Sequence, residues 1–271
     1  MPPADRSRNP IRALGAAALA GFRYAGGMSL LLCQTLRWTT LGLFSRRARF
    51  SGRALAEQVV RVGLRSVSIV VVVQLFIGVI LALQMTPPLE PWGQVDKVAN
   101  IIGVAGFRML GPIITAIVLS GFAGASIAAE LGTMVVAEEI EALEATALDP
   151  VRFLVVPRVL ATFGVTILLA ALADLMIALG GYLTSILIGA VPVGYWRRMQ
   201  EQLEYRDFVT GLIQAGVFGL LISVIACYEG LRVRGGAEGV GRATTMTVVY
   251  SIVAIIAAAC VFTMIFYVYE L

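Results

Sequence analysis

The chain has 271 residues, of which 59% are hydrophobic and only 14% are charged, and its mean hydropathy is +0.88. Soluble domains carry about 25% charged residues, so this composition excludes an ordinary soluble protein. The sequence contains no histidine, which excludes catalysis or metal binding through that side chain. Cys33, Cys227 and Cys260 lie far apart in apolar stretches, so their spacing indicates neither a metal site nor a disulfide framework.

The first 65 residues form a basic segment that we expect to lie along the membrane surface. Residues 13–44 are apolar, but Arg23 and Arg37 divide them into charge-free pieces too short to cross about 30 Å of hydrocarbon. A helix in the cytoplasmic interface fits this pattern, and a cleaved signal peptide is the alternative. A cluster of arginines follows, which marks a cytoplasmic flank. Its members are Arg46, Arg47, Arg49, Arg53, Arg61 and Arg65.

Residues 66–271 are predicted to form an all-α integral membrane domain. Residues 66–86, 109–129, 209–228 and 247–269 contain no charged side chain, and each run is long enough to cross a bilayer as a helix. A further apolar stretch over residues 153–190 is interrupted by two charged residues. It is compatible with one long helix or with a hairpin that turns near Gly180 and Gly181. The sequence therefore predicts five or six spans.

Residues 130–149 differ from the rest because they contain six acidic residues and no basic one. Val136, Ile140, Leu143 and Ala147 recur at three- and four-residue steps, so they would share one face of a helix. We expect an amphipathic helix over about residues 135–147, on the cytoplasmic side and too polar to span. The alternative is a charged loop whose acids simply face water.

Asp174 is an acidic residue within a long apolar stretch. A carboxylate at membrane depth is by default a functional hypothesis, here a proton relay. The alternative is that Asp174 lies near the outer end of a long helix and reaches water.

Several short sequence blocks between about residues 66 and 251 match, in the same order, a pattern known from a family of membrane proteins. They are Phe76-Ile77-Gly78, Leu81-Ala82-Leu83-Gln84, Leu110-Gly111-Pro112, Ala128-Ala129-Glu130-Leu131-Gly132-Thr133-Met134, Glu138-Glu139-Ile140-Glu141-Ala142-Leu143, Asp149-Pro150, Val155-Val156-Pro157-Arg158-Val159-Leu160-Ala161, Gly241-Arg242-Ala243-Thr244-Thr245 and Val248-Val249-Tyr250-Ser251. Each block alone is weak, but together they resemble the MlaE/YrbE permease family.

This resemblance implies a permease subunit of an ABC transporter that moves phospholipid or a related lipid between the bacterial inner membrane and the cell envelope. It implies a homodimer that works with a cytoplasmic ATPase and an MCE-domain lipid-binding protein. It also implies an interfacial N-terminal helix and five spans, which favours five over six. The chain itself is then not an enzyme and needs no metal, since ATP and Mg would bind the partner ATPase and no G-x-x-x-x-G-K-[ST] loop occurs here.

The resemblance also assigns candidate site residues. The acidic helix would be the coupling helix that docks on the ATPase, through Glu138, Glu139, Ile140, Glu141, Leu143 and Glu144. Candidate lipid contacts are Leu75, Val79, Ala82, Leu83, Arg108 and Met109; for those in the first span, ordinary helix packing is an equal alternative.

Two departures from the family pattern concern charge. The family's Arg-Glu-Leu-Gly-Pro is Arg108-Met109-Leu110-Gly111-Pro112 here, and its Ala-Gly-Arg is Ser120-Gly121-Phe122. An internal ion pair would thus be replaced by apolar contact.

A secondary transporter or channel and a membrane enzyme are the alternative classes of function. An ion-coupled secondary transporter or channel would favour paired intramembrane charges and broken helices in repeated halves, and neither pattern is evident. A membrane enzyme would need a cluster of nucleophile, base or metal ligands near one interface, for which the sequence gives little support.

Overall fold

A computed structural model of the chain describes residues 10–44, 52–188 and 194–269, and within these ranges it contains helices and turns but no strand. The chain divides into two compact units, Met1–Arg49 and Phe50–Leu271. In the first unit, α1 is one uninterrupted helix over Pro10–Phe44. Its position in the membrane interface stays a prediction.

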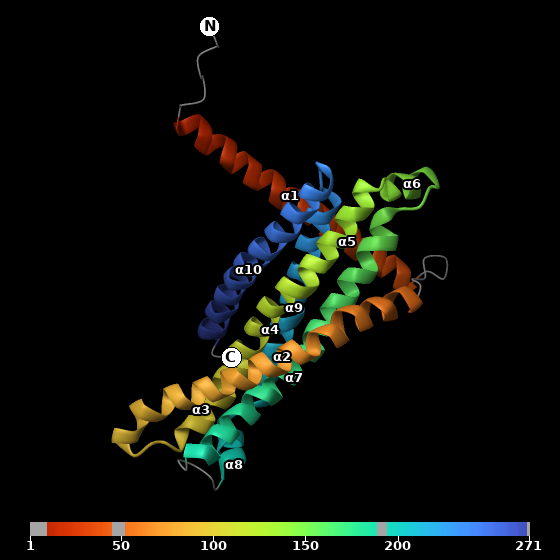
Figure 1. The fold of residues 1–271 in the computed structure, drawn as a ribbon. Coiled ribbons are helices and arrows are strands. Elements are labelled where there is room, and N and C mark those ends of the chain that lie inside the picture. Colours follow the sequence, from red (N-terminus) through yellow and green to blue (C-terminus); the bar gives the residue numbers. More distant parts are fainter. Residues whose placement is uncertain (1–9, 45–51, 189–193, 270–271) are drawn as a thin grey trace. The chain divides into compact units, whose positions relative to one another are not determined.

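The second unit is a bundle of helices (Figure 1). Its elements are α2 (Gly52–Leu89), η2 (Glu90–Trp92), α3 (Lys97–Ala105), η3 (Gly106–Leu110), α4 (Gly111–Leu119), η4 (Ser120–Gly124), α5 (Ala125–Val136), α6 (Glu139–Ala145), η5 (Val151–Val155), α7 (Val156–Ile188), α8 (Tyr195–Gln202), α9 (Tyr205–Leu231) and α10 (Gly236–Tyr269). Figure 1 shows α6 and the turn between α9 and α10 at one end of the bundle, and α3 and α8 at the other.

Five helical segments among the described residues are long and apolar enough to cross a membrane, which confirms the all-α fold and the preference for five spans. They are Gly52–Trp92, Lys97–Val136, Val151–Leu187, Tyr205–Leu231 and Gly236–Val268. Several extend well beyond the charge-free runs. At 1.5 Å per residue, α2 is roughly 57 Å long, longer than the about 30 Å of hydrocarbon that it would cross, and Arg53, Arg61 and Arg65 all precede its charge-free run.

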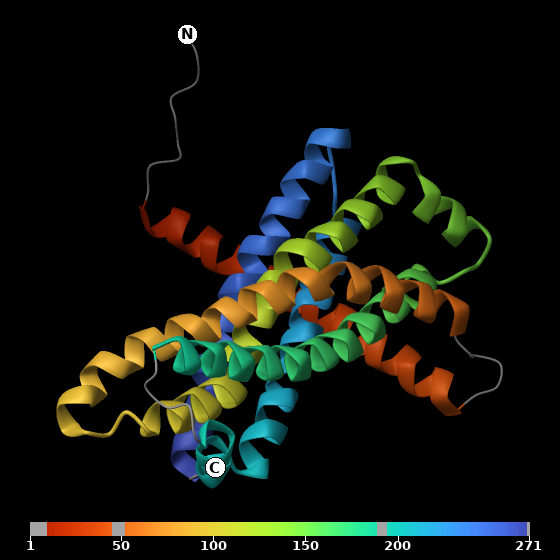
Figure 2. The same cartoon turned by 60° about the horizontal axis from the view of Figure 1, so that its bottom comes forward.

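The glycine pair in the third span does not mark a turn, so the hairpin alternative is wrong. Instead, α7 continues through Gly180 and Gly181, and these glycines allow close helix packing. A Cβ on Gly180 would overlap the carbonyl oxygen of Leu75, and one on Gly78 would overlap that of Ile177. Backbone therefore meets backbone, as small residues permit in membrane helix pairs. Figures 1 and 2 both show α2 and α7 side by side along much of their length.

The second span is not a uniform α-helix, because two π-helical turns, η3 and η4, interrupt it. Such turns insert an extra residue and change where the following side chains point. Between the two turns, Gln74 of α2 donates from Nε2 to the carbonyl of Gly111 at 3.1 Å and to Oγ1 of Thr115 at 2.9 Å. These hydrogen bonds hold α2 to α4 in the middle of the bundle.

Asp174 lies in the same layer and is 1% exposed, so the expectation that it reaches water is wrong. Its carboxyl group lies against Gly111, where a Cβ would overlap Oδ1. Neither carboxyl oxygen has a hydrogen-bond partner among the described residues. The proton-relay role stays a prediction.

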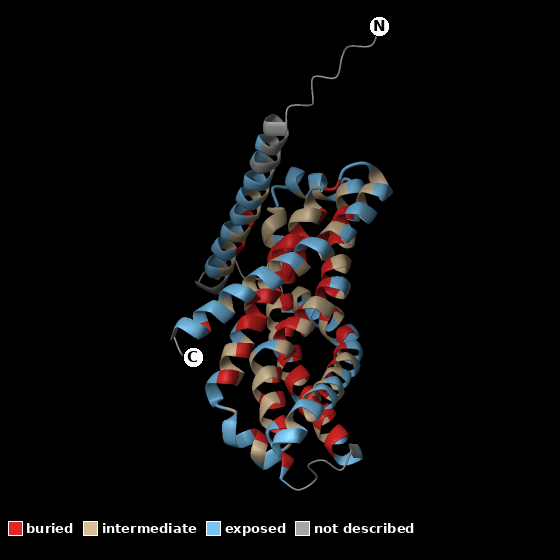
Figure 3. Cartoon of the chain, turned by 90° about the vertical axis from the view of Figure 1, so that its left-hand side faces the viewer, coloured by how far each residue is buried: buried red, intermediate tan, exposed pale blue. Residues whose placement is uncertain are grey.

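The apolar core runs through the centre of the bundle, where buried residues of α2, α4, α7, α9 and α10 meet (Figure 3). Its largest members include Leu119, Phe218, Ile222 and Ile255. By contrast, many apolar side chains of α10 remain exposed, among them Val253 and Met264. This outer surface is suited to lipid or to another membrane helix.

The α2–α7 contact can be tested by adding one methyl group at two glycines of α7. Gly180→Ala should destabilise the protein by about 1–3 kcal/mol, because the methyl group meets backbone that cannot move aside. Thermal unfolding of the purified protein in detergent measures this effect.

Gly164→Ala is the matched control, since a Cβ at that position would have none of the described atoms within 4 Å apart from the adjoining backbone of α7 itself. Equal unfolding midpoints for the two variants would contradict the proposed backbone contact.

Candidate functional site

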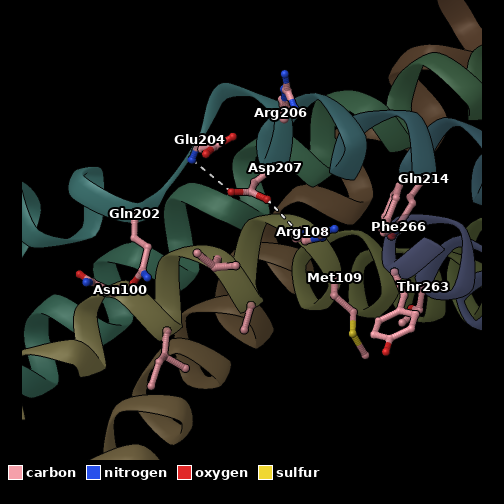
Figure 4. Close-up of a pocket in the computed structure, with 14 residues that line it drawn as sticks. Asn100, Arg108, Met109, Gln202, Glu204, Arg206, Asp207, Gln214, Thr263 and Phe266 are labelled. Atoms are coloured by element: carbon pink, nitrogen blue, oxygen red, sulfur yellow. Dashed lines mark hydrogen bonds and ion pairs between the residues drawn. The ribbon is translucent and has the colours of Figure 1, made fainter. Parts of the chain in front are cut away.

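A cavity of about 720 Å³ lies where the second span begins, between α3, η3, the start of α9 and the end of α10. Figure 4 shows its lining, in which polar groups gather near Asp207 and apolar side chains such as Met109 and Phe266 lie beside them. The volume falls within the range of about 300–1,000 Å³ that is typical of ligand pockets. A mixed lining of this kind suits an amphipathic ligand.

Arg108 provides a fixed positive charge in this cavity. Its Nη1 lies 3.5 Å from Oδ1 of Asp207, and its guanidinium carbon lies 5.0 Å from the centre of the Phe266 ring. Because the side chain is still 29% exposed, some of its five N–H donors remain accessible from the cavity. The arginine is therefore oriented by the protein and can still bind an anion.

Asp207 is positioned by the first turn of α9. Its Oδ2 accepts a hydrogen bond from the backbone N–H of Glu204 at 3.1 Å, the return half of a capping box. Its other oxygen faces Arg108 (Figure 4). One carboxylate thus fixes both the start of α9 and the direction of the arginine.

The predicted lipid contacts separate into two groups. Arg108 and Met109 line the cavity. Ala82 is buried against α3 and α7, whereas Leu83 is about half exposed. Leu75 and Val79 are half-buried, and their backbone atoms lie at the close approach to Gly180.

The sequence did not indicate the cavity residues of α9 and α10, which include Asp207, Gln214, Thr263 and Phe266. They lie about 100 residues or more beyond Arg108 in the chain, so no local spacing connects them with it.

At the opposite end, α6 forms a short helix between two left-handed residues. Glu138 before it and Ala147 after it both have φ of 59°, a conformation that is uncommon for residues other than glycine. These residues limit α6 to Glu139–Ala145, shorter than the predicted 135–147. The carboxylate Oδ1 of Asp149 then accepts from the backbone N–H of Val151 at 2.9 Å, as expected for the start of the next helix.

The predicted coupling residues all lie in α6 or directly before it. Glu138, Glu139, Glu141 and Glu144 are exposed, while Ile140 and Leu143 are half-buried. Glu130 does not belong to this group, because it lies in α5 and forms ion pairs with Arg61 and Arg158.

Comparison with known proteins gives the family. Residues 55–265 match the family model Permease MlaE. The chain belongs to the MlaE permease family. This confirms the resemblance seen in the sequence blocks, and with five apolar helices the protein is a multi-pass protein of the inner membrane.

Proteins similar to this chain come from distant organisms. The intermembrane phospholipid transport system permease protein MlaE of Haemophilus influenzae is 32% identical over 90% of this chain and 92% of its own length. A probable ABC transporter permease protein of Rickettsia felis is 35% identical over 79% of this chain and 83% of its own. The chloroplastic protein TRIGALACTOSYLDIACYLGLYCEROL 1 of Arabidopsis thaliana is 32% identical over 82% of this chain and 63% of its own.

Two substitutions at Asp207 separate its two roles. Asp207→Ala removes both the hydrogen bond to Glu204 and the ion pair, and should lower stability by about 1 kcal/mol or more. Asp207→Asn keeps an acceptor for Glu204 and should cost less, because the partly exposed ion pair contributes little. Thermal unfolding in detergent compares them, and an equal loss in both variants would mean that the ion pair dominates.

Proposed function

We propose that this chain is the permease subunit of an ABC transporter that moves phospholipid between the inner membrane and the cell envelope, driven by a separate ATPase. The observation that carries this proposal is family membership over residues 55–265, together with the phospholipid transport named for the Haemophilus influenzae relative. The cavity supports the lipid-binding part of this proposal, and the exposed acidic helix supports the part that concerns coupling to the ATPase.

The cavity supports lipid binding through the pairing of Arg108 with apolar walls. An arginine that keeps free N–H donors binds phosphate through charge-assisted hydrogen bonds. Met109, Val104 and Phe266 line the same cavity and offer apolar contact to the beginning of the acyl chains. The headgroup site proposed here is therefore centred on Arg108 and Met109.

The acidic helix supports coupling to the ATPase. Ile140 and Leu143 would enter an apolar groove of the partner, while Glu138, Glu139, Glu141 and Glu144 would meet basic residues around it. Such charges fix orientation and partner choice more than they raise affinity. ATP and Mg would bind the ATPase, and the chain itself contributes no catalytic residue.

Two further partners complete the proposed assembly. A second copy of the permease would cover the exposed apolar side of α10, which includes Val253, Ile256 and Met264. An MCE-domain protein would meet the end of the bundle that carries α3 and α8, close to the cavity, and exchange lipid there.

Purification of the tagged protein from its native membranes tests the assembly. We expect an ATPase subunit and an MCE-domain protein to co-purify, with two permease copies per complex by native mass spectrometry. Glu139→Lys combined with Glu141→Lys should reduce the bound ATPase at least tenfold, because both exposed carboxylates change sign.

Glu90→Lys combined with Glu201→Lys makes the same charge change on exposed residues at the opposite end of the bundle and should leave ATPase binding unchanged. Retention of the ATPase by the α6 variant would reject α6 as the coupling helix, and the absence of any ATPase with the unaltered protein would reject the ABC transporter.

Substitution of Arg108 tests the lipid site. Arg108→Ala should weaken phospholipid binding about tenfold or more, because a hydrogen bond to a charged group contributes about 1.5–3 kcal/mol. Quantifying phospholipid that co-purifies with the protein, by mass spectrometry, measures the loss.

Arg197→Ala provides the control, since Arg197 is 85% exposed and pairs with Glu201 rather than lining this cavity. Arg108→Lys keeps the charge and should fall between the two. An unchanged phospholipid content in Arg108→Ala would place the headgroup elsewhere.

A further inference from the structure

Three helices are joined by one carboxylate near the α6 end of the bundle. Glu130 of α5 places Oε2 2.8 Å from Nη1 of Arg61 on α2, and Oε1 3.0 Å from Nη2 of Arg158 on α7. Each oxygen therefore serves a different helix. The acid is no part of the exposed surface of α6, although it precedes that helix closely in sequence.

The two ion pairs differ in burial. The Arg158 side chain is 6% exposed, and its Nη1 also donates to the carbonyl of Leu154 at 2.7 Å. Separating Arg158 from Glu130 would leave a buried charge unpaired, which is strongly unfavourable. The Arg61 side chain is 41% exposed, so water can replace its partner at far lower cost. The α5–α7 pair is thus essential to the fold, whereas the α5–α2 pair can be removed at little cost in stability.

The Arg61–Glu130 pair spans a crevice between α2 and α5. Side chains from α2 line one wall, and side chains from η4 and α5 line the other. The lining includes Gln58, Arg61, Val62, Phe122, Ser126 and Glu130. The close backbone contacts of α2, which involve Gly78 and Gly180, are made with α7. The ion pair therefore joins α2 to α5 across a crevice of about 10 Å³, which has room for about one water molecule.

The path of the chain gives this link a mechanical position. Glu130 lies on α5, which leads into α6, and Arg158 lies on α7, which follows it. Their ion pair therefore connects the two helices on either side of α6, called the α6 stems below. Through its ion pair with Glu130, Arg61 connects the α6 stems to α2. At its far end α2 leads into α3, which lines the cavity.

We propose that the Arg61–Glu130 ion pair transmits movement of α6 to α2, and so couples ATP hydrolysis to changes in the cavity. This inference rests on the proposed function. Arg61 is a positioning residue in this scheme, since it contacts neither lipid nor nucleotide. Glu130 and Arg158 keep the α6 stems moving as one body.

Arg61→Met tests the proposal in the complete transporter, reconstituted with its ATPase and MCE-domain partner in phosphatidylethanolamine and phosphatidylglycerol vesicles. The measurement is fluorescent phospholipid transferred per ATP hydrolysed. We expect at least a fivefold fall in this ratio, with ATPase binding, ATP hydrolysis and the unfolding midpoint close to those of the unaltered protein. Arg61→Lys, which can still reach one carboxylate oxygen, should restore most of the ratio.

Arg53→Met is the control, because it removes an ion pair from the same helix, between side chains that are 89% and 66% exposed. It should leave the ratio unchanged. A ratio for Arg61→Met within twofold of the unaltered protein would overturn the inference, as would an equal fall in Arg53→Met.

Glu130→Gln adds a second measurement. It cuts both ion pairs, so it should lower the unfolding midpoint as well as the transport ratio, whereas Arg61→Met should lower only the ratio. If Glu130→Gln left both quantities unchanged, the three-helix link would have no mechanical role. Failure of the unaltered complex to transfer phospholipid would instead reject the proposed function itself.

Discussion

The close approach of α2 and α7 is the constraint on which the rest of the bundle depends. Within a membrane, apolar side chains gain little by leaving lipid for protein, so helices associate through packing and interhelical hydrogen bonds. Gly78 and Gly180 remove the side chains that would separate the two backbones. With this pair fixed, Gln74 can reach α4, and Arg61, farther along α2, can reach Glu130 of α5.

Different groups of charged residues lie at the two ends of the bundle. One end presents the acids of α6 and the Glu130 ion pairs, and the other holds Arg108 between Asp207 and Phe266. The layer between them is apolar apart from a few buried groups, of which Gln74 and Asp174 are the most polar. Partners at the two ends can therefore act on the same long helices without sharing a surface.

The sequence was sufficient for the class of fold and for four of the spans, because a charge-free run of about twenty residues is typical of a membrane-spanning helix. Its limits appear at particular residues. Gly180-Gly181 was compatible with a turn or with close packing, and only the position of Leu75 on another helix decides between them. Arg108 was identified through a family motif, but Asp207 and Phe266 come from distant segments and reach it only after folding. Glu130 was grouped with its acidic neighbours because sequence proximity cannot show that α5 ends after it.

The two left-handed residues that border α6 affect the free-energy cost of ordering this helix when a partner binds. Glu138 and Ala147 border α6 in a conformation that residues with a side chain rarely adopt, and Glu139–Ala145 between them is already helical in the single chain. A partner that recognises a preformed helix does not have to order it, and ordering costs about 0.5–1.5 kcal/mol for each mobile side chain. In the coupling role proposed for α6, the docking surface can therefore remain small, with seven residues in α6 itself.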